Sequence, residues 1–347
     1  MDPVAARRTL RLAFGTALAL AISLVFNWSV SFITPVLLSF LLAVPMPAPN
    51  FRQGVTFILA LVIPIWAANW LLLPFLTYQP AVGLLLLIAA CFWSFYYSAS
   101  GGSPVMGAFL TLGLAVVAAV GSDSVDSVLA VNKALTLNAI IAICFLWMIH
   151  ALFPDKPLER STSPRPQAEP PSGETAIRSA WRSTVIVLPV IVFFLFYAGS
   201  ASYMVVMIKV ASMGQQAEND STRAVGKNLL MSTVIGGSGA VIMWNIMGIW
   251  PSPVLYVLLV VLAGLIMGRH VFQGQGMNPK AGVWSYAFLT MLVIIAPALM
   301  DSAGGDAAGA KFFDRLIMMG WATLYGVAAV SVFDAFWRGK AQQTVVE

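Results

Sequence analysis

The amino-acid sequence predicts an all-α integral membrane protein of about twelve transmembrane helices, built as two parallel six-helix repeats. The first observation is composition, because 59% of the 347 residues are hydrophobic and only 10% are charged. Soluble domains carry about 25% charged residues, so the composition indicates that lipid surrounds this chain. The second observation is a series of apolar stretches of roughly 17–25 residues, each long enough to cross a bilayer. The third is an internal repeat.

The apolar stretches fall into two groups of six, separated by a polar segment. Residues 1–153 form the first predicted repeat and residues 178–347 the second. The segment between them, 154–177, is rich in proline, serine and charged residues, which predicts a flexible cytoplasmic linker. The expected spans are 9–27, 31–48, 54–76, 81–98, 104–121, 133–152, 180–198, 201–217, 226–248, 252–270, 281–299 and 312–336.

The internal repeat is visible without gaps at a fixed offset. Three pairs of like residues stand 171 positions apart at matching points of the two groups: Arg11 and Arg182, Arg52 and Arg223, and Pro80 and Pro251. Because each group contains an even number of spans, the two copies are expected to point the same way. A pseudo-two-fold axis along the membrane normal would then relate them, and transport paths usually lie at such an axis.

The distribution of lysine and arginine predicts the orientation of the chain. Placing the N-terminus in the cytoplasm puts most of the 19 basic residues on the cytoplasmic side. Only Lys133, Lys311 and Arg315 then fall outside, and Lys209 falls inside a span. Because cytoplasmic loops are enriched in basic residues, both termini and the linker are expected to be cytoplasmic.

Lys209 is the clearest candidate functional residue, because it lies inside the apolar stretch 201–217. A charged side chain in hydrocarbon costs several kcal/mol, so such a residue is a functional candidate. The repeat places Leu38 at the equivalent position of the first half. One interpretation is a cationic site for an anionic substrate, or a lysine that exchanges protons. The alternative is a lysine that extends to the cytoplasmic interface of a tilted or shorter span.

Arg52 and Arg223 are the second pair of candidates, because both follow an interrupted span. Several prolines precede Arg52, and the polar run Gln215–Asp220 precedes Arg223. Each arginine begins a predicted third span, where free amide groups and the helix dipole favour anions. Guanidinium also binds carboxylate in a bidentate way. These residues therefore predict an intracellular site that captures anions, with contact to lipid phosphates as the alternative.

His150 and Asp334 lie near the cytoplasmic ends of the sixth and twelfth predicted spans. Histidine and carboxylate groups at membrane depth can relay protons, which makes the pair a candidate for proton coupling. The alternative for Asp334 is an interfacial ion pair with Arg338, one helical turn along the chain.

The sequence offers no motif for catalysis. It contains no Walker motif, no His-Glu-x-x-His motif, no nucleophile elbow and no cluster of metal ligands. We therefore expect no enzyme activity, no metal and no cofactor. The formal net charge of +5 is accounted for by the cytoplasmic loops, so no binding of nucleic acid is expected.

Three features of the first half stand together: the basic entry Arg-Arg-Thr-Leu-Arg at 7–11, the small-residue stretch FGTALALA, and the interrupted second span that leads into Asn-Phe-Arg-Gln-Gly at 50–54. In these features the chain resembles the fusaric acid resistance (FUSC) and aromatic acid exporter superfamily. The six-helix repeat extends the resemblance over nearly the whole chain. Larger members carry a sizeable cytoplasmic domain where this sequence has only a short linker.

The resemblance implies a bacterial inner-membrane secondary transporter driven by the proton gradient. Such proteins export small, frequently aromatic, organic anions and often work with a periplasmic membrane-fusion protein. Basic residues that line the path would correspond to Arg52, Arg223 and Lys209. The alternatives are an anion channel, or a membrane-embedded subunit or scaffold of an envelope complex without transport of its own.

Overall fold

The structure is a computed structural model that describes most of the chain. It covers residues 2–102, 104–120, 125–154, 173–196, 222–274, 276–301 and 307–343, together with Val206, Lys209, Val210 and Met213. The part of the chain so described is almost entirely helical, as predicted. Nine of the described helices are long and apolar enough to cross a membrane. The chain is therefore a multi-pass helical membrane protein.

The helices follow one another in two series. The first comprises α1 (Pro3–Phe26), α2 (Ile33–Leu42), α3 (Phe51–Ala67), the π-helical turn η1 (Ala68–Leu72), α4 (Leu73–Tyr78), α5 (Pro80–Ala99), α6 (Pro104–Val120) and α7 (Val125–Leu152). The second comprises α8 (Gly173–Phe196), α10 (Thr222–Ile249), α11 (Pro253–Val271), α12 (Ala281–Asp301) and α13 (Ala307–Gln343). A two-residue antiparallel hairpin, β1 (Phe272–Gln273) and β2 (Gly276–Met277), joins α11 to α12.

Local sequence signals explain where several helices begin. Asp2 precedes α1, and its Oδ1 accepts a hydrogen bond from the Val4 amide at 2.9 Å. Proline occupies the first turn of α1, α5 and α11, where its missing N–H is not needed. Asn50 and Gln53 form a capping box at the start of α3, with the Asn50 amide donating to Gln53 Oε1 at 2.9 Å.

Several predicted boundaries differ from the structure; α7, for example, begins at Val125 and not at 133. Only Ile33–Leu42 is helical within the predicted span 31–48, because Pro45, Pro47 and Pro49 cannot continue a helix. Helix α8 begins at Gly173, so the last residues of the predicted linker are already helical. The predicted span 201–217 lies outside the described residues, apart from Val206, Lys209, Val210 and Met213.

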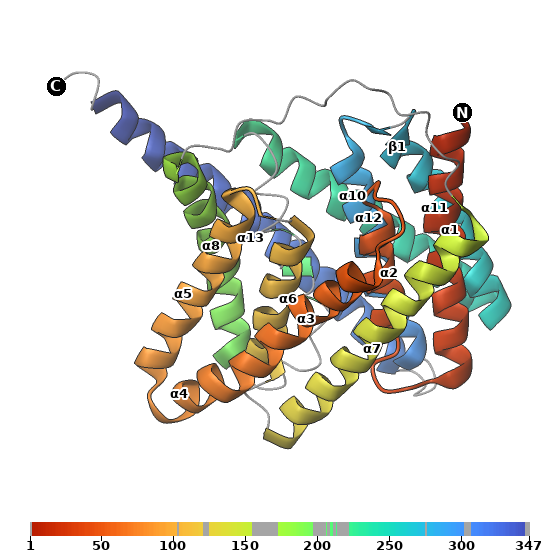
Figure 1. The fold of residues 1–347 in the computed structure, drawn as a ribbon, viewed down its shortest axis with the longest axis horizontal. Helices are drawn as coiled ribbons and strands as arrows, with labels where there is room; N and C mark the ends of the chain where they lie inside the picture. The colour runs from red at the N-terminus through yellow and green to blue at the C-terminus, as the bar shows by residue number, and fades with distance from the viewer. Residues whose placement is uncertain are drawn as a thin grey trace.

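The two series pack against each other through a reciprocal pair of contacts. Helix α1 packs on α11, and α5 packs on α8. Figure 1 shows these two pairs at opposite sides of the molecule. Within the first series α3 contacts α6 and α7, and within the second α10 contacts α12 and α13. The helical segment Phe51–Tyr78 and α10 (Thr222–Ile249) also have the same length and stand 171 residues apart at both ends.

The α1–α11 contact depends on small residues. A Cβ atom added at Gly264 would lie 2.7 Å from Ala13 Cα, and one added at Gly268 would lie 2.8 Å from Thr9 Cγ2. Glycines four residues apart allow two helices to approach this closely. The reciprocal α5–α8 contact is aromatic instead, with the rings of Phe92 and Trp181 at a centroid distance of 4.9 Å.

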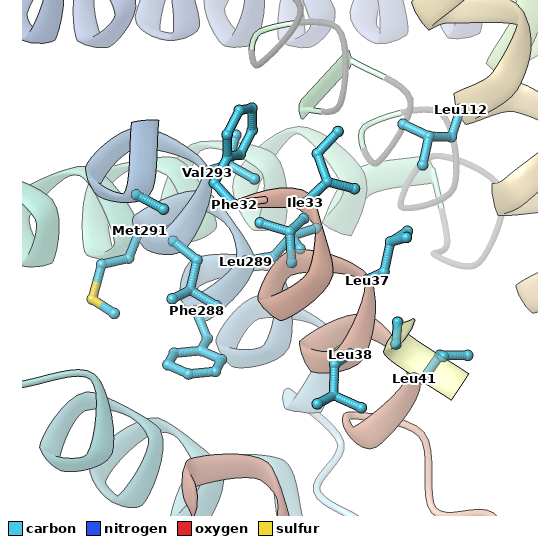
Figure 2. Close-up of a cluster of buried hydrophobic side chains, with 14 of the residues drawn as sticks. Phe32, Ile33, Leu37, Leu38, Leu41, Leu112, Phe288, Leu289, Met291 and Val293 are labelled. Atoms are coloured by element: carbon cyan, nitrogen blue, oxygen red, sulfur yellow. The ribbon is translucent and has the colours of Figure 1, made fainter. Parts of the chain in front are cut away.

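The short helix α2 lies in the apolar core, where it packs against α1, α7 and α12. Figure 2 shows the side chains of Ile33, Leu37 and Leu38 on α2, which runs beside α12. All three are buried. Asn138 of α7 ties down the connection before α2, because its Oδ1 accepts from Trp28 Nε1 at 3.0 Å and from Thr34 Oγ1 at 2.7 Å.

Candidate functional site

Lys209 lies inside the second series of helices and not at its surface. Its side chain is 1% exposed, and its Nζ donates a hydrogen bond to Thr290 Oγ1 at 2.8 Å. Thr290 is near the middle of α12 and donates in turn to the Tyr286 carbonyl at 2.7 Å. The lysine head group therefore meets a polar partner inside the bundle and does not extend to an interface.

Gly236 of α10 allows that helix to pass close to Thr290. A Cβ atom added at Gly236 would lie 2.4 Å from the Ala287 carbonyl oxygen and 2.7 Å from Thr290 Cβ. Only glycine allows α10 to pass this close to α12 at the level of Thr290. Its neighbour Gly237 faces Leu316 instead, so Gly236 is the glycine that sets the backbone against which Thr290 is held.

Residues one turn from Lys209 fix the position of its segment. Met213 is 1% exposed and packs with Ile186 of α8, Leu229 of α10 and Val330 of α13. Val206 is also fully buried. Met213, one turn after Lys209, is therefore enclosed by helices of the second series. The counterpart of Lys209 in the first series, Leu38, is buried in an apolar environment (Figure 2).

The structure does not bring Arg52 to Lys209. Arg52 is exposed in the first turn of α3, where its carbonyl accepts a hydrogen bond from Thr56 Oγ1 at 2.8 Å. Arg223 lies in the first turn of α10, and its side chain is outside the described part of the chain. The matching places of the two arginines, each at the start of a third helix, agree with the sequence analysis.

His150 is buried near the end of α7, with 7% of its surface exposed. Its Nδ1 lies 2.8 Å from the Leu146 carbonyl oxygen. Because a carbonyl oxygen only accepts hydrogen bonds, this contact places the hydrogen of the neutral ring on Nδ1 and leaves Nε2 as a hydrogen-bond acceptor. Asp334 lies on α13, and its side chain is outside the described residues.

Two arginines of α1 have a structural role that the sequence analysis did not anticipate. Arg11 is 3% exposed and donates to the Phe153 carbonyl from Nε at 2.8 Å and also from Nη2. Arg7 donates from Nη1 to the Pro154 carbonyl at 2.8 Å. These carbonyls follow the end of α7 and have no helical partners, so the arginines cap that helix.

Thr290 is the other residue that the sequence did not reveal. It is a hydroxyl residue within the apolar stretch 281–299, and threonine is common in membrane helices because its hydroxyl can bond to its own backbone. The sequence does not show that Thr290 faces Lys209, because that depends on how α12 packs in the bundle. The buried lysine alone was visible from the sequence.

Together these groups make a cation-centred site inside an apolar bundle. The Thr290 hydroxyl donates to the Tyr286 carbonyl and holds the lysine amine in place. The amine, when protonated, presents N–H donors and one positive charge, which suits an anionic oxygen. The low dielectric of the interior strengthens such an interaction, and it also makes the charge costly without an anion.

One family model matches the chain, the model for the Protein of unknown function (DUF2955), over residues 8–149. That is a family of membrane proteins, and the matched residues run from α1 to near the end of α7. Neither the comparison with curated proteins nor the comparison with solved structures finds a match.

Proposed function

We propose that this chain is a secondary transporter that exports small organic anions across the bacterial inner membrane, driven by the proton gradient. The observation that carries the proposal is Lys209, a cation 1% exposed inside the bundle with its Nζ on Thr290. A charge kept at this depth in a multi-pass protein is costly, and such residues mark substrate or ion pathways and proton relays. Carboxylates of small, frequently aromatic acids are the substrates that we expect it to bind.

We further propose that the chain consists of two parallel copies of one six-helix unit. The reciprocal packing of α1 on α11 and α5 on α8 supports this arrangement, because a two-fold axis exchanges these contacts. The equal lengths of Phe51–Tyr78 and α10 (Thr222–Ile249), 171 residues apart, support it as well. The family match over 8–149 falls within the first proposed unit.

The site is asymmetric within this pseudo-symmetric frame. The second unit carries Lys209 at this position, whereas the first unit carries the apolar Leu38 at the equivalent position. An anion that approaches from the cytoplasm would first meet Arg52 and Arg223 at the starts of the third helices. It would then pass to Lys209 in the interior. The positive-inside distribution of basic residues supports cytoplasmic termini, and the start of α1 and the end of α13 lie on the same side in Figure 1.

His150 is the residue that we propose for proton coupling, together with Asp334. The Nδ1 contact with the Leu146 carbonyl leaves Nε2 as the proton-accepting atom of a buried imidazole. A periplasmic membrane-fusion protein is the partner expected for an exporter of this kind. We also expect the chain to lack enzyme activity of its own.

The test is transport by the purified full-length chain in proteoliposomes. Radiolabelled 4-hydroxybenzoate serves as the probe, an imposed pH gradient as the driving force, and protein-free vesicles as the measure of passive permeation. We expect accumulation against the concentration gradient that a protonophore abolishes and that Lys209→Met lacks. Flux that only equilibrates the probe would identify an anion channel. No flux above protein-free vesicles for this or related aromatic carboxylates would favour a scaffold and contradict the proposal.

A further inference from the structure

Asn132 of α7 is a buried amide with an unusual property. Its side chain is 1% exposed, and within the described part of the chain neither Oδ1 nor Nδ2 has a hydrogen-bond partner. Asn138, further along the same helix, is equally buried but well bonded. Its Oδ1 accepts two hydrogen bonds, and its Nδ2 donates to the carbonyls of Ser29 at 3.2 Å and Ala134 at 2.7 Å.

The contacts between α3 and α7 place Asn132 at one end of their interface. The two helices run antiparallel, because Trp147 Nε1 donates to the Pro49 carbonyl at one end and Trp66 Nε1 contacts Thr136 Oγ1 at 3.4 Å nearer the other. Thr136 Oγ1 also donates to the Asn132 carbonyl at 2.8 Å. Asn132 therefore lies one helical turn beyond the Trp66–Thr136 contact, toward the periplasm in the proposed orientation.

The helix facing this end is interrupted. One turn beyond Trp66, α3 passes into the π-helical turn η1 (Ala68–Leu72), whose Asn69 is 8% exposed. A π-helical turn widens a helix and leaves a backbone carbonyl without its normal partner, and such turns occur frequently at functional sites. Asn132 on α7 and Asn69 on η1 therefore lie on the same side of the Trp66–Thr136 contact.

An unbonded amide is costly in a protein surrounded by lipid. Each polar group without a partner costs several kcal/mol in such an interior. A buried amide that lacks both hydrogen bonds therefore indicates a transient partner, such as a ligand. An amide presents one acceptor and one donor side by side and carries no net charge. Its complement is a group with the same pair in reverse, which is a primary carboxamide or a protonated carboxylic acid.

We propose that Asn132 forms a binding site for a neutral carboxamide or protonated carboxylic acid, on the α3–α7 interface and apart from Lys209. The pairing uses two parallel hydrogen bonds, from Asn132 Nδ2 to the ligand carbonyl and from the ligand N–H or O–H to Asn132 Oδ1. The site does not depend on the binding of an anion by Lys209, so it stands or falls separately from the proposed transport function.

The experiment is ligand binding by the purified full-length chain in detergent, followed by thermal unfolding. The probes are benzamide, benzoic acid in acidic buffer, and methyl benzoate, which accepts hydrogen bonds but cannot donate one. We expect benzamide to raise the melting temperature of the wild type and of Lys209→Met, and methyl benzoate to leave it unchanged. A shift with benzoic acid as well would extend the site to protonated acids. Asn132→Leu is expected to weaken benzamide binding at least tenfold.

The stability of the unliganded variants separates a ligand site from a structural residue. Because the Asn132 amide lacks partners, Asn132→Leu is expected to melt at the same temperature as the wild type or higher. Asn138→Leu, the matched control, removes four hydrogen bonds and is expected to melt lower while still binding benzamide if it folds. If Asn132→Leu melts lower and the wild type binds no benzamide, a fixed water satisfies the amide and the proposal is wrong. Equal benzamide binding by Asn132→Leu and the wild type would also overturn it.

Discussion

Lys209 and Thr290 meet inside the bundle, with the lysine Nζ donating to the threonine Oγ1 at 2.8 Å. The two residues come from segments 81 positions apart, and the hydrogen bond lies at the middle of α12. A lysine at this depth had two interpretations, a functional cation or a residue extending to the interface. Because the head group is bonded to a residue in the middle of α12, the structure argues against the second, and a function for the lysine stays a prediction.

Replacing Lys209 with methionine is expected to abolish transport and to preserve folding. Methionine keeps the length of the side chain and removes the charge, and apolar replacement of a buried ionic group is often neutral or stabilising. Uptake of 4-hydroxybenzoate into proteoliposomes should fall to the level of protein-free vesicles. Lys227→Met removes an exposed lysine of α10 and is the matched control. Normal uptake by Lys209→Met would show that this lysine is not the substrate site.

Removal of the Thr290 hydroxyl is expected to impair both stability and transport. Thr290→Val keeps the shape of the side chain but leaves the lysine amine facing a methyl group, at a cost of about 1–3 kcal/mol. Thr290→Ser retains the hydroxyl and should retain transport. Thr323→Val is the control, because Thr323 is a buried threonine that bonds to Thr233 Oγ1 at 3.0 Å and not to a lysine. Equal transport by the valine variants at 290 and 323 would contradict a role for the Lys209–Thr290 pair.

Adding one methyl group at Gly236 is expected to disturb the site more than the same change next to it. The new Cβ of Gly236→Ala would lie 2.4 Å from the Ala287 carbonyl oxygen, a backbone atom that cannot move without shifting α12. Overpacking of this kind costs about 1–3 kcal/mol. Gly237→Ala meets only Leu316 Cδ1 at 3.3 Å, the end of a flexible side chain, and should change stability little. Thermal unfolding of the two variants in detergent measures the difference.

The sequence predicted the spans well and their partners poorly. Apolar length alone locates a membrane helix, so α5 and α11 were predicted close to their observed bounds. Which helices touch is decided by surface shape, and a single sequence does not show that Gly264 and Gly268 face α1 and not another helix. The short α2 was also overextended, because the hydropathy of 43–48 remained apolar while its prolines ended the helix.

The candidate site was predictable only in part for a related reason. Lys209 was conspicuous because a charge in an apolar stretch is rare. Thr290 and Asn132 were not, because neutral polar residues are common in membrane helices and acquire meaning only from what surrounds them. The amide of Asn132 became informative when the structure showed that Asn138 is bonded and Asn132 is not.

Arg11 is expected to stabilise the fold by capping α7, in addition to any contribution it makes to orientation. Arg11→Met removes the hydrogen bonds from the guanidinium to the Phe153 carbonyl, and charge-assisted bonds of this kind contribute about 1.5–3 kcal/mol each. Arg52→Met, which removes an exposed guanidinium, should change stability by less than about 0.5 kcal/mol. Thermal unfolding in detergent compares them. Equal melting temperatures for the two variants would mean that the cap on α7 contributes nothing.

The glycines of α11 provide a last test, on the contact between α1 and α11. Gly264→Ala would place a Cβ atom 2.7 Å from Ala13 Cα, so the two helices must separate along their length. We expect a loss of about 1–3 kcal/mol in the free energy of unfolding. Gly320→Ala makes the same chemical change in α13, where nothing lies within 4 Å of the new atom. There alanine should stabilise the helix by about 0.5–1 kcal/mol, because glycine loses more backbone entropy on folding. The two variants should therefore shift the melting temperature in opposite directions. If Gly264→Ala raises it as Gly320→Ala does, α1 and α11 do not pack through their backbones in the membrane, and the proposal of two six-helix units loses one of the two reciprocal contacts that support it.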